Sequence, residues 1–354
     1  AGGVISLAYA ARVEHSGWVY FATMSGSAVG AVFPGIFLPL FGEGKLLAVV
    51  CLVPLVVLPF AGRFLFRVLG ASVFILAIVF AGTLPQGHPL IGVKPSPYRA
   101  LSQTLKFPDT RIIRTSSSLR GRIDRVASPY IRYAPGLSLQ YTQAMPRQDA
   151  IFTDGDNRLV LYDRGAPMDL DFARFTLSYA GYRLSGEPGR VLALLTNGGI
   201  SIPCALASGA ESIVLVHPHP IVAGMIADHY GLPAIAASHR EYLASVDERF
   251  SVLHVENWGA SLTGSDALNQ DYSFTVDAFG AYLKRLADDG VLIMSRRLLL
   301  PPSDALRLWA GAYEGLLAWG AAAPHRHIAM YRNWDTVVLI VSAQPLQKTS
   351  RDGD

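Results

Sequence analysis

The feature that most constrains the fold is the segment from Arg190 to Pro220, which has the pattern of a strand, a turn, a helix and a second strand. Val191–Leu195 is a short, uninterrupted apolar run, typical of a strand buried on both faces of a parallel sheet. A glycine pair follows, then a helical segment at 200–207 and a second apolar run at 213–216. In such a unit the crossover is right-handed and the glycine turn lies at the start of the helix.

The turn itself does not specify a ligand. In nucleotide-binding units of this kind, glycines let the ligand approach the backbone, and an acidic residue at the end of the second strand binds the ribose hydroxyls. The turn here is Thr196-Asn197-Gly198-Gly199, which contains fewer glycines than such loops, and the position after Val216 is His217. No acidic residue follows before Asp228. The pattern therefore predicts the architecture and leaves the ligand open.

Alternating helices and strands continue on both sides of this unit. Further strands are predicted at 234–237, 250–256 and 291–295, a turn at 288–290, a helix at 303–319 and a closing hairpin at 326–342. Upstream, a helix is predicted at 170–184, and strands at 111–116, 137–142 and 150–162, the last interrupted by a hairpin turn at Asp154-Gly155. The expected fold is a Rossmann-like, seven-stranded sheet ending in a hairpin, preceded by a small antiparallel β-sheet.

The N-terminal part has the composition of a membrane protein. Hydrophobic residues make up 51% of the chain and charged residues 16%, and the apolar excess lies before Thr83. The apolar runs at 17–41, 46–61 and 64–84 predict about three transmembrane helices, with 1–12 as a partial one. Pro34 and Pro39 predict a kink in the first. The alternative is a set of buried core helices.

The distribution of basic residues orients the chain. The stretch from Lys94 to Arg125 is rich in basic residues, which favours a cytoplasmic C-terminal domain under the positive-inside rule. A bacterial inner membrane is the expected location. The small residues Gly26 and Gly30 allow another helix to approach closely, so we expect the bilayer and other integral membrane subunits as partners. The net charge of +3 and the absence of a dense basic run give no indication of nucleic-acid binding.

These patterns predict five regions. Transmembrane helices occupy 1–84, a connector rich in proline and glycine 85–110, a small β subdomain 111–165, a Rossmann-like domain 166–346 and a polar tail 347–354.

Several segments together resemble a known family. These are the hairpin at Asp154-Gly155, the strand-helix-strand unit, the strand FSVLHVE, the segment YSFTVDAFGAYLKRLADDGVLIMSR and the closing hairpin. From Arg111 to Leu346 the chain resembles spermidine synthases, which are aminopropyltransferases with the class I S-adenosylmethionine-dependent methyltransferase fold. It is most similar to bacterial membrane-embedded spermidine synthase-like proteins, in which transmembrane helices precede this domain.

The resemblance assigns roles to six positions. Asn197, Gly198 and Gly199 correspond to the glycine-rich motif. His217 and Ser238 stand where the family has the acids that bind the ribose and the adenine amine of the donor. Glu256 stands where the family has a catalytic Asp that helps to deprotonate the attacking amine. Both donor-binding acids are therefore replaced, whereas the catalytic carboxylate is kept and is one methylene longer.

Two main functions follow from the resemblance. The first is a catalytically degenerate, membrane-anchored protein that binds no cofactor and serves as an accessory or scaffold subunit of a membrane complex. The alternative is an active aminopropyltransferase or methyltransferase that uses S-adenosylmethionine or its decarboxylated form, with Glu256 as general base. A transporter or sensor is a third possibility, but the apolar runs provide no ion-coupling carboxylate.

No metal site is expected from the sequence. His217, His219 and His254 could be ligands, but no cysteine or carboxylate joins them at a recognised spacing. Cys51 and Cys204 are predicted to be buried thiols.

Overall fold

The computed structural model describes residues 2–11, 13–52, 95–163, 170–186, 188–258 and 272–346, together with residues 68, 72, 75, 76, 79 and 83. Its contacts divide the chain into two units. One comprises 1–95 with 116–122, and the other 96–115 with 123–354.

The first unit contains a long apolar helix. Helix α1 (Gly2–Ala11) and the 3-10 turn η1 (Val13–His15) precede α2 (Ser16–Leu52). Among the described residues, one helical segment, Val13–Leu47, is long and apolar enough to cross a membrane. The predicted first span lies within it. Most of the predicted run at 46–61 and most of that at 64–84 lie outside the described residues.

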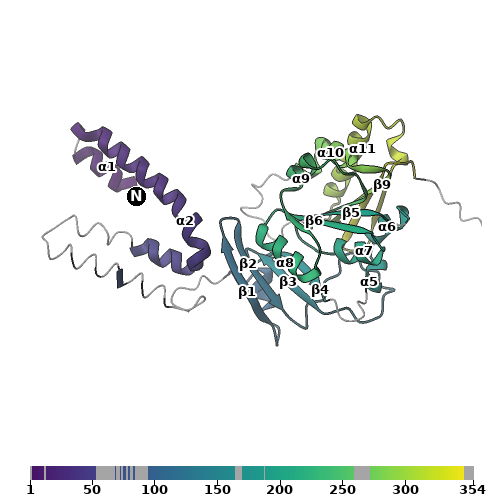
Figure 1. Cartoon of the computed structure of the whole chain (residues 1–354), viewed down its shortest axis with the longest axis horizontal. Coiled ribbons are helices and arrows are strands. Elements are labelled where there is room, and N and C mark those ends of the chain that lie inside the picture. The colour runs from purple at the N-terminus through teal and green to yellow at the C-terminus, as the bar shows by residue number, and fades with distance from the viewer. Residues whose placement is uncertain are drawn as a thin grey trace, which may run out of the picture. The chain divides into compact units, whose positions relative to one another are not determined.

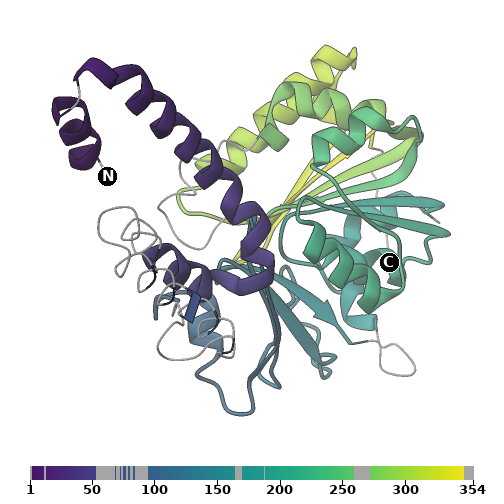
Figure 2. The same ribbon diagram turned by 60° about the vertical axis from the view of Figure 1, so that its left-hand side comes forward.

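The interruption in α2 lies later than predicted. The backbone leaves the helical conformation at Gly42, with φ 73° and ψ 171°, rather than at Pro34 or Pro39. Glycine adopts a positive φ without steric cost, so it is the residue at which the chain changes direction. Figure 2 shows this bend in α2.

The small antiparallel sheet has four strands in sequential order. They are β1 (Arg111–Ser118), β2 (Gly121–Ala127), β3 (Gln148–Thr153) and β4 (Asn157–Tyr162), and the short helix α4 (Ala100–Thr104) precedes them. The predicted hairpin turn is confirmed, because Asp154 and Gly155 both have positive φ between β3 and β4. The predicted strand at 137–142 is wrong, because Leu137 forms only an isolated bridge with Thr176. The strand between β1 and β3 in the sheet is β2.

The large sheet has seven strands in the order β10-β11-β9-β8-β5-β6-β7. Their bounds are β5 (Arg190–Leu195), β6 (Ser212–His217), β7 (Ala234–Ala236), β8 (Phe250–Glu256), β9 (Leu286–Arg297), β10 (Ile328–Arg332) and β11 (Thr336–Ser342). Strands β5 to β9 pair in parallel, and β11 runs antiparallel to both β9 and β10. This is the methyltransferase-type sheet ending in a hairpin that the sequence predicts.

Helices cover both faces of this sheet (Figure 1). One face carries α5 (Asp171–Arg174), α6 (Tyr179–Leu184), α7 (Ser201–Ala207) and α8 (Pro220–Tyr230), and the other α9 (His239–Ser245), α10 (Val276–Lys284) and α11 (Ser303–Trp319). Short 3-10 turns occur at η5 (Tyr272–Phe274) and η6 (Pro324–Arg326). Val191, Ala193 and Leu195 belong to the first core, and Leu192 and Leu194 to the second. The unbroken apolar run of β5 is thus explained by burial on both faces.

Two predicted elements differ in detail. The helix expected at 170–184 is divided into α5 and α6, because the chain between them turns to bridge Thr176 with Leu137. The turn expected at 288–290 lies within strand β9, which begins at Leu286. Phe250 pairs with Leu286 and Val252 with Val291, so the intervening residues of β9 form a bulge.

Candidate functional site

The glycine turn lies where a ligand binds in open α/β sheets. Strand β5 has β6 on one side and β8 on the other, all parallel, so the strand order reverses at β5. In such sheets ligands bind outside the carboxyl ends of the strands at this switch point. The turn at 196–200, His217 and Glu256 follow or end these three strands, and the structure brings them together.

Glu256 folds back onto the glycine turn. Its side chain is fully buried and accepts four hydrogen bonds. Oε1 accepts from the backbone N of Ile200 at 2.9 Å and from Trp258 Nε1 at 2.8 Å. Oε2 accepts from the backbone N of Ser201 at 3.0 Å and from Ser201 Oγ at 2.7 Å. The carboxylate therefore satisfies the backbone amides at the start of α7, which have no partner within that helix.

Burial and hydrogen bonding act on the Glu256 carboxyl in opposite directions. Burial raises its pKa above the ordinary value, and the donors from Ser201, Trp258 and Ile200 partly reverse that shift. All four contacting groups are N–H or O–H donors, an arrangement that suits an ionised carboxylate, which only accepts.

Trp258 covers the first glycine of the pair. Its backbone N donates to Asn197 Oδ1 at 2.7 Å, and Asn197 is itself buried. A Cβ built on Gly198 would overlap both the Trp258 indole and Glu256 Oε1. Glycine is therefore required here to admit side chains of the same chain, whereas in nucleotide-binding loops it admits the ligand.

Strand β4 closes a second side of the turn. Gly198 N donates to Arg158 O at 2.8 Å, and Val160 N donates to Gly198 O at 2.8 Å. A Cβ on Gly199 would overlap the carbonyl oxygen of Val160. The glycine pair is thus held between β4 and the Glu256–Trp258 pair.

His217 is buried and neutral. Its Nε2 donates to Thr196 O at 3.2 Å and its Nδ1 accepts from His219 N at 3.0 Å, an arrangement that fixes the tautomer. Burial lowers its pKa from 6.5 to about 4. His239 likewise donates through Nε2 to Leu195 O at 3.1 Å. These imidazoles therefore bind loop and strand carbonyls of the same chain.

The other predicted site residues lie apart from this cluster. Ser238 is the N-cap of α9: its hydroxyl accepts from Glu241 N, and the Glu241 carboxylate accepts from Ser238 N. His254 lies in the core, where its ring nitrogens bind Tyr182 Oη at 3.0 Å and Ser295 Oγ at 2.7 Å. Within the described residues, no group of three or more histidine, cysteine or acidic residues could hold a metal ion.

Sequence reasoning missed two residues of the site, Ser201 and Trp258. Both contact Glu256, one from the start of α7 and the other from two positions further along the chain. The available signal was the spacing Glu256-Asn257-Trp258, which lets both side chains reach the same side of the chain as β8 ends.

The comparisons with known proteins concern the fold. No family model and no curated protein matches the chain. Among solved structures, it is similar to spermidine synthase from Thermotoga maritima, at 15% identity, covering 66% of this chain and 74% of that one, with a TM-score of 0.42. A spermidine synthase in complex with the transition-state analogue AdoDATO is 15% identical to this chain. The match covers 66% of this chain and 73% of that one, with a TM-score of 0.41. The chain is also similar to ribosomal protein L11 methylase from Lactobacillus delbrueckii subsp. bulgaricus. The identity is 20%, the match covers 47% of this chain and 76% of that one, and the TM-score is 0.32. The structural neighbours of this chain are thus spermidine synthases and methyltransferases.

Proposed function

We propose that this protein is a membrane-anchored, catalytically degenerate relative of the spermidine synthases that serves as an accessory or scaffold subunit of a membrane protein complex. The observation that carries the proposal is the occupation of the glycine turn by Glu256 and Trp258. The polar groups and the space that a donor nucleoside would use are taken by side chains of the chain itself.

The two replaced acids support the same conclusion. His217 is neutral and already bound to Thr196 and His219, so it cannot accept hydrogen bonds from two ribose hydroxyls. Ser238 uses its hydroxyl to cap α9. Hydrogen bonds to charged groups contribute about 1.5–3 kcal/mol each, and two of them are lost together.

The exposed surface of α2 supports a partner within the bilayer. Gly26 and Gly30 lie four residues apart and are exposed, and a Cβ at either would contact nothing within 4 Å. Small residues at this spacing allow two helices to pack closely in lipid. We propose that another integral membrane subunit binds here, with the α/β domain on the cytoplasmic side of a bacterial inner membrane.

Calorimetry on the full chain in mild detergent tests the loss of donor binding. We expect no saturable heat with S-adenosylmethionine or its decarboxylated form at millimolar concentration. Saturable binding of either nucleotide by the unaltered protein would contradict the proposal. The double variant His217→Glu, Ser238→Asp tests whether the loss of the two acids is by itself enough to prevent nucleotide binding. If this variant also fails to bind either nucleotide, the glycine turn occupied by Glu256 and Trp258 is what prevents binding.

The partner proposal has its own test. Replacing Gly26 and Gly30 by Leu should release the protein from co-purifying membrane subunits and leave the α/β domain folded, as judged by its near-ultraviolet circular dichroism. The matched control replaces Val29 and Val32, which are exposed large residues of the same helix, by Leu. Unchanged co-purification of the glycine variant would place the contact elsewhere.

A second candidate is an active aminopropyltransferase or methyltransferase. It is favoured by the raised pKa of Glu256, because catalytic bases are often carboxyls whose pKa burial has shifted. In this case transfer to an amine would be measurable with either donor, and Glu256→Gln would abolish it. Under the first proposal no transfer occurs in either protein.

A further inference from the structure

A large cavity lies away from the glycine turn, on the small β-sheet. Its volume is about 890 Å³, within the range of small-molecule sites. Charged side chains from several elements line it: Asp109, Arg111, Arg125, Arg147, Asp149, Asp163 and His229. None of these residues takes part in the site described above.

Strand register explains why charged side chains gather on this face. Asp149 of β3 lies opposite Ala127 of β2 and Leu161 of β4. Arg125 precedes Ala127 by two residues, so it projects from the same face of the sheet. His229, the penultimate residue of α8, reaches this face from outside the sheet. The cavity is therefore built by residues that lie far apart in the sequence, such as Arg125 and His229, which are 104 positions apart.

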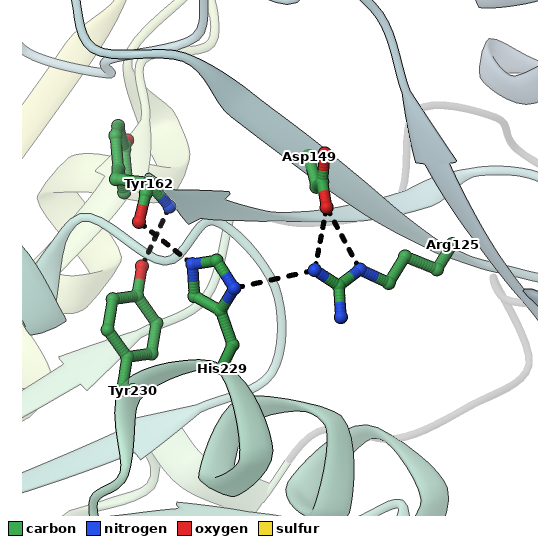
Figure 3. Close-up of polar contacts among 5 residues, drawn as sticks. All are labelled: Arg125, Asp149, Tyr162, His229 and Tyr230. Carbon is green, nitrogen blue, oxygen red and sulfur yellow. Dashed lines mark hydrogen bonds and ion pairs between the residues drawn. The ribbon is translucent and has the colours of Figure 1, made fainter. Parts of the chain in front are cut away.

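Arg125 is held in one orientation (Figure 3). Its Nε and Nη2 donate to Asp149 Oδ2 at 3.0 and 2.6 Å, and Nη2 also contacts His229 Nδ1 at 3.4 Å. His229 Nε2 donates to Tyr162 O at 2.9 Å, so Nδ1 carries the lone pair that accepts from the guanidinium. Tyr162 N in turn donates to Tyr230 Oη at 2.8 Å. The remaining guanidinium nitrogen, Nη1, has no partner among the residues drawn in Figure 3.

Four further charged side chains around the cavity are unpaired within the described part of the chain. Arg111, Arg147, Asp109 and Asp163 form no side-chain ion pair or hydrogen bond within the described part of the chain. Arg125 and Asp149 neutralise each other, and the other four comprise two cations and two anions. The cavity therefore presents both signs of charge with no net excess.

We propose that this cavity binds a small zwitterionic molecule, with its oxyanion on the arginines and its ammonium group on the aspartates. A simple dianion would gain from Arg111 and Arg147 but would face Asp109 and Asp163, and a diamine would meet the reverse penalty. A ligand that carries both groups satisfies all four side chains. The fixed guanidinium of Arg125 adds a preorganised donor to the lining of the cavity.

The experiment is calorimetry on the full chain in detergent with O-phosphoethanolamine as the probe. Inorganic phosphate and putrescine each carry only one sign of charge and serve as comparison ligands. We expect the zwitterion to bind at least about tenfold more tightly than either, since each charge-assisted hydrogen bond contributes about 1.5–3 kcal/mol. No binding of the zwitterion at about ten millimolar, or tighter binding of putrescine or phosphate, would overturn the proposal.

Variants locate the binding. Arg147→Ala and Asp163→Asn should each weaken O-phosphoethanolamine about tenfold or more. Arg147→Ala should leave the affinity for putrescine undiminished. The matched controls are Arg183→Ala and Asp289→Asn, two exposed charged residues outside the cavity, which should bind as the unaltered protein does. Equal weakening by the controls, or none by the cavity variants, would refute this location. Thermal unfolding of every variant verifies that its fold is intact.

A lipid headgroup and a free metabolite share this chemistry, and reconstitution separates them. If phosphatidylethanolamine is the source, nanodiscs of that lipid should abolish binding of free O-phosphoethanolamine, whereas nanodiscs of phosphatidylglycerol should not. If a free metabolite is the source, binding persists in both. Loss of binding in both lipids would contradict the proposal, because phosphatidylglycerol has no ammonium group to compete.

Discussion

Glu256 is the residue on which the glycine turn depends most. Four donors point at a carboxylate that is removed from solvent, so each oxygen has two partners. A buried ionised group is tolerated only when its hydrogen bonds compensate for lost hydration. The same bonds that make Glu256 stable hinder its use as a base, because a substrate amine would have to displace one of them.

The first prediction concerns this carboxylate. Glu256→Gln replaces one oxygen by an NH2 group that faces two donors, and each buried donor left without an acceptor costs about 1–3 kcal/mol. We expect a clearly lower free energy of unfolding, measured by denaturant titration. Glu248→Gln is the control, because Glu248 is half exposed in an ion pair with Arg190 and such pairs contribute about 1 kcal/mol or less. Equal losses in the two variants would show that the Glu256 network is not stabilising.

The second prediction concerns buried histidines and pH. Burial lowers the pKa of His217 from 6.5 to about 4, and that of His254 from 6.5 to about 3. Between pH 6.5 and 4 the unfolded chain binds more protons than the folded one, so stability is present above pH 6.5 and is lost on acidification. The His217 shift corresponds to roughly 3 kcal/mol.

His217→Gln removes one of these groups. As the pH is lowered from 6.5 to 4, the free energy of unfolding of this variant should fall less steeply than that of the unaltered protein. It should still fall, because His254 also contributes to the pH dependence. His325→Gln, at an exposed position, should leave the profile unchanged. An identical pH profile for His217→Gln and the unaltered protein would show that His217 is not the titrating group.

At the scale of elements, β4 and the glycine turn form one unit. The bridge between Leu159 and Gly198 joins the small sheet to the turn after β5. Gly199 has a φ of +99° and lies directly against the carbonyl of Val160. The second glycine is therefore required by both its backbone conformation and the proximity of β4.

The third prediction separates these two requirements. Gly199→Ala should be strongly destabilising, since it combines a positive φ with a clash against backbone that cannot move cheaply. Gly186→Ala is the matched control, with a φ of +70° and nothing within 4 Å of the added Cβ, and should cost only about 1–2 kcal/mol. Thermal melts compare the two. Similar losses would mean that the contact with Val160 contributes little.

At the scale of the whole molecule, the α/β domain contains its own hydrophobic cores. Both buried clusters are formed by residues between Leu101 and Val341. The long apolar helix, in contrast, is largely exposed in its own unit. The hydrophobic residues that require detergent are therefore expected to lie in the N-terminal unit.

The fourth prediction follows from this separation. A chain comprising residues 96–354 should be monodisperse without detergent and should unfold cooperatively, because it retains both cores. Size-exclusion chromatography and calorimetric melting check this, with the full chain in detergent as the reference. Aggregation, or a melt without a cooperative transition, would show that the N-terminal unit is needed for folding.

The order of elements in the α/β domain could be predicted from the sequence, because hydrophobic periodicity is a local property. The helix expected at 303–319 coincides with α11, and the β3–β4 hairpin follows from the Asp154-Gly155 turn. Local signals failed where tertiary contacts decide the backbone. Thr176 bridges to Leu137 and divides a predicted helix, and pairing with β8 places the predicted turn at 288–290 in a bulge within β9.

The sequence by itself determined the long apolar helix, the strand-helix-strand unit and the identity of the residues at the glycine turn. Only the tertiary structure decided what these residues do. Glu256 reaches Ser201 across 55 positions, and Arg125 meets His229 across 104, because neighbouring strands and a crossover helix bring them into contact. Such contacts depend on the order of strands in the sheet and on helix packing, which bring together residues that are far apart in the chain.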